Sequence, residues 1–183
     1  MTEMDTEKQL IEIVKNYLDG ANASHTKYGC KQIGDNRFSC LVSGFEGSVF
    51  NELHILLTVK ENCVVSECFL PVSAKPEVFT DVAEYFMRIN HMAARGYLLL
   101  DYENGFMRYE LIVDDAALLY EAHRERAMRY LLEIGPYMFD QIGDSLTAIL
   151  FGGKDGRTVK EIIEKDLADR EEEENDDPGE EKE

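Results

Sequence analysis

Four cysteines are the first candidates for chemistry in this chain: Cys30, Cys40, Cys63 and Cys68. They do not form a C-x-x-C motif. Cys63 and Cys68 lie five residues apart on one predicted strand, so they point to opposite faces and cannot share a metal ion. Cys30 and Cys40 oppose each other if the loop at residues 34–36 has three residues, and lie on different faces if it has two. We therefore expect no metal site and four reduced, partly buried thiols.

The histidines and the glycine-rich loop also lack the spacing of a known metal-binding or catalytic motif. The four histidines, His25, His54, His91 and His123, do not have a metal-ligand spacing such as H-E-x-x-H. His123 falls on an apolar stripe, which predicts a hydrogen-bonded core histidine. Residues 152–158 have the residue types of a phosphate-binding loop but not its G-x-x-x-x-G-K-[ST] order, and no serine occurs in G-x-S-x-G. The sequence thus predicts no catalytic, cofactor-binding or metal-binding residue.

Charge narrows the classes of partner. The chain has 37 acidic and 19 basic residues and a formal net charge of −18. Such a surface repels nucleic-acid phosphates and anionic membranes, so we expect neither as a partner. It is compatible with a basic protein segment and also with solubility alone. There is no apolar run of the ~20 residues that a membrane helix needs and no secretory signal at the N-terminus, which predicts a cytoplasmic protein.

Length and composition predict one domain over residues 1–168 and a disordered acidic tail over residues 169–183. The length suits a single core of ordinary size. The tail contains ten acidic residues against Arg170 and Lys182. A segment of this composition cannot bury enough apolar surface to offset its ordering entropy.

The N-terminal half has the pattern of a helix followed by an antiparallel meander. Apolar residues recur with helical spacing over residues 7–19. Alternating apolar and polar residues then predict a hairpin over residues 28–42 and strands over residues 53–59 and 63–70. The short connections between these strands favour antiparallel pairing.

The central stretch, residues 76–113, predicts a helix, a glycine stop and a hairpin. Pro76 suits the first helical position, and Gly96 suits a left-handed stop. Asn104-Gly105 lies between two apolar runs, a strong hairpin signal. If these two residues form the loop, Asp101 pairs with Arg108 across the strands. Asn90 lies on the apolar stripe of the helix, and we expect its amide to bond to the backbone near Gly96.

The C-terminal third is predicted to be helical. One helix is expected from Asp115 to about Ile134, a break at Gly135-Pro136, a second helix to Phe151, and a short third helix over Thr158–Leu167. Together these elements predict an α+β fold, in which helices pack mainly on one face of an antiparallel sheet of five to six strands.

Several short motifs resemble the YbjN family, whose fold is similar to that of the type III secretion chaperones. These motifs are Arg88-Ile89-Asn90, Gly96-Tyr97, Asp101, the run from Gly105 to Tyr109, and Phe151-Gly152-Gly153. The resemblance extends loosely over residues 7–167, and the long helical segment from Asp115 to Gly135 departs from the family pattern. It implies a type III secretion chaperone-like fold and a bacterial regulator of sensory transduction, without catalytic residues.

The predicted hairpin also suggests where function could reside. Its second face carries a set of apolar and aromatic residues around one arginine: Tyr97, Leu99, Phe106, Arg108 and Ile112. Soluble monomers rarely leave such a patch in water, so either the chain's own helices, a second subunit or a partner must cover it. We expect a non-enzymatic protein-binding module, chaperone-like or regulatory, that binds a protein partner or forms a homodimer. The alternatives are an enzyme whose site forms only in three dimensions, and a structural domain whose acidic tail recruits a basic partner.

Overall fold

The computed structural model describes residues 3–23, 28–43, 49–152 and 158–176. Six strands form one antiparallel sheet in the order β1-β2-β3-β4-β6-β5, which confirms the predicted α+β class. The strands are β1 (Tyr28–Gly34), β2 (Arg37–Ser43), β3 (Glu52–Lys60), β4 (Cys63–Ser73), β5 (Tyr97–Leu100) and β6 (Phe106–Asp114). The helices are α1 (Glu3–Ala23), the 3₁₀ turn η1 (Pro76–Val78), α2 (Phe79–Met92), α3 (Asp115–Leu119), α4 (Glu121–Phe151) and α5 (Val159–Asp176).

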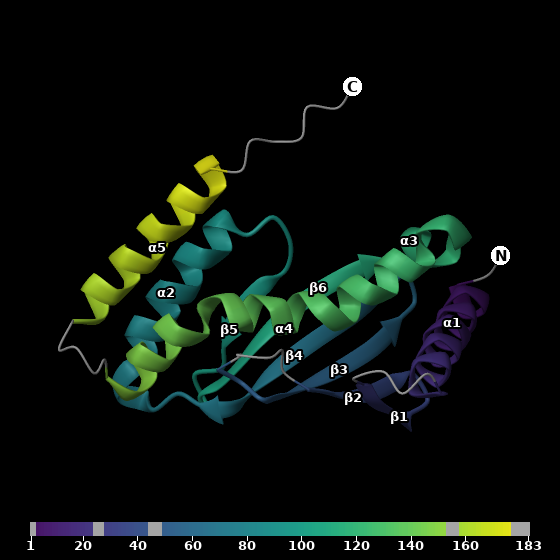
Figure 1. Ribbon diagram of the computed structural model, residues 1–183. Helices are drawn as coiled ribbons and strands as arrows, with labels where there is room; N and C mark the ends of the chain where they lie inside the picture. The colour runs from purple at the N-terminus through teal and green to yellow at the C-terminus, as the bar shows by residue number, and fades with distance from the viewer. Residues whose placement is uncertain (1–2, 24–27, 44–48, 153–157, 177–183) are drawn as a thin grey trace.

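The helices lie on one face of the sheet (Figure 1). Helix α4 crosses β4 and β6, α1 packs near β1 and β3, and α2 and α5 pack beside each other at the other end. Alternate residues of the strands face this layer, and those of β2, β3 and most of β4 and β6 are buried, including Ile55, Leu57 and Met107. The hydrophobic core therefore fills the space between the helices and one side of the sheet.

The predicted helix break at Gly135-Pro136 is wrong, because α4 continues through Pro136 to Phe151. A proline inside a helix removes one backbone hydrogen bond and pushes the preceding turn open. Here the neighbouring carbonyl of Leu131 accepts a hydrogen bond of 2.5 Å from the buried hydroxyl of Ser66 on β4. The sheet thus supports the helix at the position where the sequence alone predicts a break. The actual interruption is at Tyr120, between α3 and α4.

The predicted pair of Asp101 with Arg108 is also wrong. Leu99 opposes Arg108 and Leu100 opposes Met107, so the register is shifted by two residues and the loop is longer than Asn104-Gly105. Asp101 instead stabilises this loop, since its carboxylate accepts hydrogen bonds from the Glu103 N–H and the Asn104 side chain. A shift of two residues keeps every side chain on its predicted face.

The hairpin of β1 and β2 resolves the alternatives for Cys30 and Cys40. The turn is formed by two residues, but the register shifts between Gln32 and Gly34, so that Ile33 is the extra residue of a β-bulge. Cys30 therefore opposes Cys40 directly. The bulge restores the register that a two-residue turn alone would have lost.

Three smaller predictions can be compared with the structure. Asn90 does bond to the backbone near Gly96, because its amide pairs with both the N–H and the carbonyl of Leu98. His123 is exposed, and its ring makes an edge-to-face contact with Tyr120 at a centroid distance of 4.9 Å, so its predicted core position is wrong. Helix α5 extends to Asp176 and so includes the first part of the predicted tail, whereas residues 177–183 lie outside the described residues.

Candidate protein-binding face

The second side of the sheet carries no helix among the described residues. We call it the open face, and its side chains form rows across neighbouring strands. One row is Leu41, His54, Phe69, Arg108 and Leu99, the next is Lys31, Ser39, Leu56, Glu67, Glu110 and Tyr97, and the third is Arg37, Thr58, Val65 and Ile112. A two-layer domain normally buries such a sheet on one side only, so the open face is accessible to another molecule.

All five residues of the predicted interaction face lie on the open face. Tyr97 is 60% exposed, Phe106 is 51% exposed and Ile112 is 55% exposed, while Leu99 and Arg108 are half-buried between their neighbours. The sequence left three kinds of cover open: the chain's own helices, a second subunit or a partner. Within the described ranges, the helices of this chain do not cover the patch. These residues therefore form an apolar and aromatic patch in contact with solvent.

Arg108 has a different partner from the predicted one. Its Nε lies 3.1 Å from a carboxylate oxygen of Glu67 on β4, an ion pair within the open face. This Nε is buried and lacks good hydrogen-bond geometry to that oxygen. Phe69 and Leu99 flank Arg108 on the adjacent strands. Arginine, like aromatic residues, is enriched at protein interfaces.

The open face also includes residues that were not singled out from the sequence. Leu41 is exposed on β2, and Phe69 lies beside His54 with ring centroids 6.3 Å apart. The Nε2 of His54 shares a hydrogen bond of 2.6 Å with the Ser39 hydroxyl. The alternation of residues 53–60 and 63–70 identifies the two faces of β3 and β4, but it does not say which face the helices cover.

Charge on the open face is balanced although the chain as a whole is strongly acidic. The described strands contribute four basic residues, Lys31, Arg37, Lys60 and Arg108, and four acidic residues, Glu52, Glu67, Glu110 and Asp114. The two signs are separated across the sheet. The half formed by β1 and β2 has only cations, β3 has one residue of each sign, and the half formed by β4 and β6 has three acids and one arginine.

The described residues outside the open face form a hollow but no cluster of metal ligands. No group of three or more His, Cys, Asp or Glu side chains within the described ranges could hold a metal ion. A hollow of about 570 Å³ beside α2 and α5 has walls formed by Met87, Arg88, Asn90, His91, Met92 and Leu167, none of which is a carboxylate or a thiol.

The opposed cysteines form a thiol pair facing the core. A hydrogen bond from the Cys40 thiol lowers the pKa of Cys30, while the same bond and burial raise the pKa of Cys40. Burial alone raises the pKa of the Cys68 thiol. Both effects keep Cys40 and Cys68 in the neutral form, in which a cysteine behaves as a small apolar side chain.

Comparison of this chain with protein-family models, with curated proteins and with solved structures found no match. Among the helices of the described residues, none combines the length and the apolar character required to cross a membrane.

Proposed function

We propose that this chain is a non-enzymatic protein-binding module and that the open face is its binding surface. The observation that carries the proposal is the exposure of Tyr97, Phe106 and Ile112 on the side of the sheet that faces away from the helices. Aromatic residues and arginine are enriched in the cores of protein interfaces. Their burial by a partner would release water from apolar surface, which is the main driving force of association.

A chaperone-like or regulatory role of the YbjN type is part of this proposal. The motifs that resemble the family, apart from Phe151-Gly152-Gly153 at the end of α4, lie in the α2–β5–β6 unit. Two residues of that unit, Asn90 and Asp101, have structural roles in it. The same unit presents Tyr97 and Phe106 on the open face. We also place the protein in the cytoplasm, where its thiols would remain reduced, and expect neither nucleic acid nor membrane as a partner.

A second copy of the chain is the partner that the charges favour. The open face has no net charge, whereas the chain carries −18, so this surface can approach a second copy with the least repulsion. Rotation of the second copy by 180° about an axis parallel to the strands places its β1–β2 half over the β4–β6 half of the first. Lys31 and Arg37 of each copy then face the acidic side around Glu67 and Glu110 of the other. Such a contact is isologous and closes as a dimer.

Exchange of charges across the open face tests this arrangement. Lys31→Glu cancels the +2 charge of the β1–β2 half, and Glu110→Lys cancels the −2 charge of the β4–β6 half. Each variant alone thus loses the attraction between the two halves and is expected to self-associate at least tenfold more weakly. An equimolar mixture of the two variants is expected to form heterodimers, since the intact −2 half of one variant then faces the intact +2 half of the other, and residues 31 and 110 carry opposite charges in both contacts. Sedimentation velocity measures the association, and isotope labelling of one variant identifies the heterodimer by native mass spectrometry.

The control is Lys15→Glu, which makes the same change of charge at an exposed position of α1. It should leave the association constant within about twofold, because a surface charge outside the contact acts only through screened long-range repulsion. A wild-type chain that stays monomeric at high concentration would contradict the second copy as partner. If Lys15→Glu and Lys31→Glu weakened self-association equally, the proposed orientation of the two copies would be contradicted.

Adjacent residues of β6 provide a separate test of the apolar part of the surface. Ile112 points to the open face and is 55% exposed, while Val113 points to the core. Ile112→Asp should weaken self-association at least tenfold with little change in melting temperature, because it removes an apolar contact only in the complex. Val113→Asp should instead lower the melting temperature by many degrees, because it buries a charge. Loss of the folded monomer in Ile112→Asp would show that this residue belongs to the core.

A further inference from the structure

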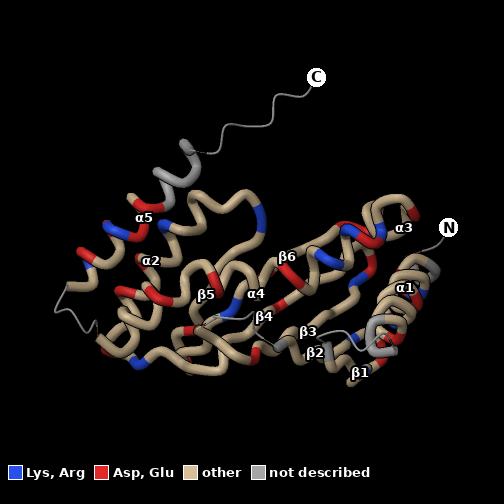
Figure 2. Tube along the Cα trace, in the orientation of Figure 1, with Lys and Arg blue, Asp and Glu red and all other residues tan. Residues whose placement is uncertain are grey.

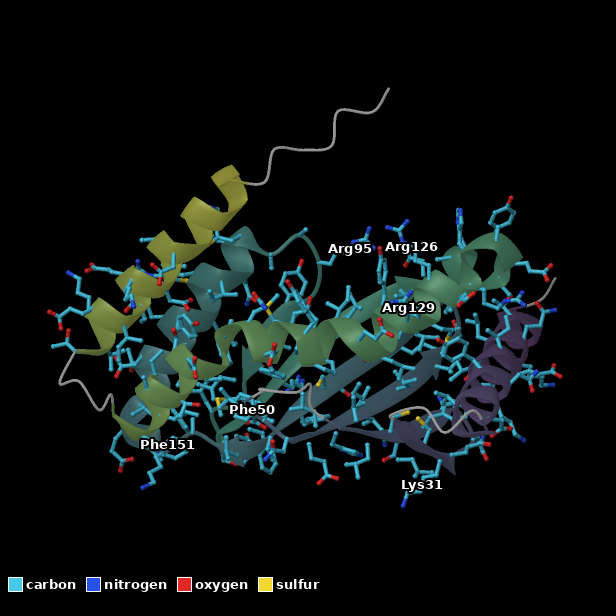
Figure 3. All side chains as sticks on the ribbon, in the orientation of Figure 1. Lys31, Phe50, Arg95, Arg126, Arg129 and Phe151 are labelled. Carbon is cyan, nitrogen blue, oxygen red and sulfur yellow. The ribbon has the colours of Figure 1, made fainter. Side chains whose placement is uncertain are left out.

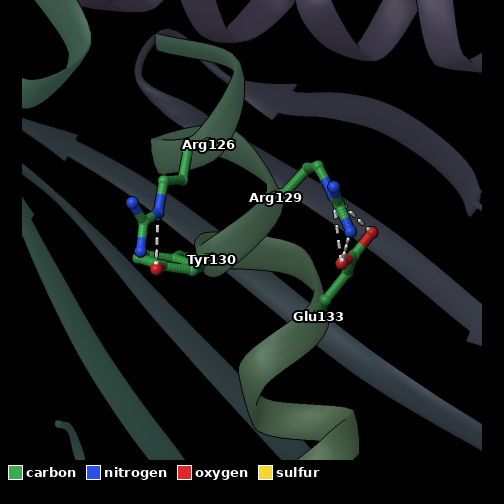
Figure 4. A network of polar contacts seen from close by, with 4 residues as sticks. All are labelled: Arg126, Arg129, Tyr130 and Glu133. Carbon is green, nitrogen blue, oxygen red and sulfur yellow. Dashed lines mark hydrogen bonds and ion pairs between the residues drawn. The ribbon is translucent and has the colours of Figure 1, made fainter. Parts of the chain in front are cut away.

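Two arginines from distant parts of the chain surround one tyrosine on the helix side of the molecule. The guanidinium carbon of Arg95, in the loop between α2 and β5, lies 4.9 Å from the centre of the Tyr130 ring. That of Arg126 on α4 lies 5.2 Å from the same centre. Figures 2 and 3 show the α2–β5 loop beside the N-terminal half of α4, and Figure 4 shows Arg126 against Tyr130. The fold thus brings two positive charges together around a single ring.

Neither arginine has a carboxylate partner among the described residues, although the chain has 37 acidic and only 19 basic residues. Arg88 pairs with Glu84 at 2.6 Å, Arg108 with Glu67 and Arg129 with Glu133, each at 3.1 Å. Two neighbouring cations repel each other unless an anion lies between them. The arrangement therefore leaves a charge of +2 that the described part of the chain does not neutralise.

The guanidinium groups are held in place before any ligand arrives. The Nε–H of Arg126 donates a hydrogen bond of 2.7 Å to the Tyr130 hydroxyl oxygen. The backbone of Arg95 is fixed because its carbonyl accepts a hydrogen bond from the Tyr109 hydroxyl, and the following Gly96 takes a left-handed conformation with φ of 65°. Stacking on an aromatic ring restricts an arginine while its terminal N–H groups remain available as donors.

We propose that Arg95 and Arg126 bind a dianionic phosphoryl group over Tyr130. The planar fork of a guanidinium matches phosphate oxygens, and two such forks neutralise a charge of −2, whereas one carboxylate would neutralise only half of their charge. The acidic remainder of the chain weakens this attraction little, since salt screens charges beyond about 8 Å at physiological ionic strength. The site lies on the helix side, so it does not depend on self-association through the open face.

Titration of the wild-type chain with inorganic phosphate, blocked phosphoserine and acetate tests the proposal. Binding of each compound is followed through the Nε–Hε signals of the arginines in NMR spectra of the protein. Both phosphoryl compounds should shift the signals of Arg95 and Arg126, and acetate should bind at least tenfold more weakly. Stronger binding of phosphoserine than of phosphate would identify a phosphorylated side chain as the source, and the reverse order would identify a small phosphate. Signals of Arg95 and Arg126 that do not move with either phosphoryl compound would overturn the proposal.

Arg129 supplies a matched control, because it lies one turn from Arg126 on the same helix but is paired with Glu133 (Figure 4). Arg95→Gln and Arg126→Gln should each weaken phosphate binding at least tenfold, and Arg129→Gln should change it less than twofold. All three substitutions remove one charge at an exposed position. If Arg129→Gln weakened phosphate binding equally, then phosphate would respond only to the general charge of the surface, and the proposed site would be contradicted.

Discussion

Gly135→Ala is expected to reduce the free energy of unfolding by about 1–3 kcal/mol, the range typical of overpacking a well-ordered core. Helix α4 lies directly on β4 at this residue. A methyl group there would lie 2.5 Å from the Cβ of Cys68 and 3.6 Å from a ring carbon of Tyr109. The first distance is too short for a contact between two non-bonded carbon atoms, so the helix or the strand must shift. Urea denaturation followed by circular dichroism measures the loss.

Gly20→Ala is the matched control, since it makes the same change in a helix where nothing lies within 4 Å of the new methyl group. It should raise the free energy of unfolding by about 0.5–1 kcal/mol, because alanine has the higher helix propensity. The two substitutions therefore have opposite predicted signs. A stabilising Gly135→Ala would mean that α4 does not approach β4 as closely as described.

The same region shows why the continuous helix α4 could not be predicted from the sequence. A proline after a glycine is a strong local signal for the end of a helix, and the sequence contains nothing nearby that opposes it. The helix continues because α4 packs across β4, where Ser66 bonds to the Leu131 carbonyl from 65 positions away in the chain. Local periodicity identifies the helical segments on both sides of Pro136, but only tertiary packing joins them.

The open face was predicted more successfully than the contacts within it. Alternation along residues 97–100 and 106–113 placed Tyr97, Leu99, Phe106, Arg108 and Ile112 together, and the error of two residues in the register moved none of them to the other face. The ion pair of Arg108 with Glu67 could not be predicted, because it depends on β6 pairing with β4 across the sheet. The approach of Arg95 to Tyr130 is non-local for the same reason.

Asn90 was identified correctly because a single amide on an apolar stripe must find a partner. The prediction that follows is that Asn90→Ala reduces the free energy of unfolding by about 2–4 kcal/mol. The substitution removes hydrogen bonds of 2.9 Å to the Leu98 carbonyl and 2.8 Å from the Leu98 N–H. A bond of this kind contributes about 1 kcal/mol, and a partly buried group left without a partner adds a desolvation penalty of about 1–3 kcal/mol.

The position of Leu98 explains why this loss should be large. Strand β5 is the last strand of the sheet, so the side of Leu98 that faces away from β6 has no further strand to pair with. Asn90 takes the place of that strand and joins α2 to β5. Hydrogen exchange should therefore report faster exchange of the Leu98 amide in Asn90→Ala, because the free edge of the strand becomes accessible to water.

Asn104→Ala provides the comparison, since it also removes two side-chain hydrogen bonds, one to the Asp101 carboxylate and one from the Phe106 N–H, but in an exposed loop. Water can replace both partners there, so the expected loss is only about 0.5–1 kcal/mol. Denaturation of the three proteins under the same conditions gives the difference. If Asn104→Ala proved as destabilising as Asn90→Ala, then the number of hydrogen bonds, rather than their burial at the sheet edge, would determine the stability of the α2–β5–β6 unit.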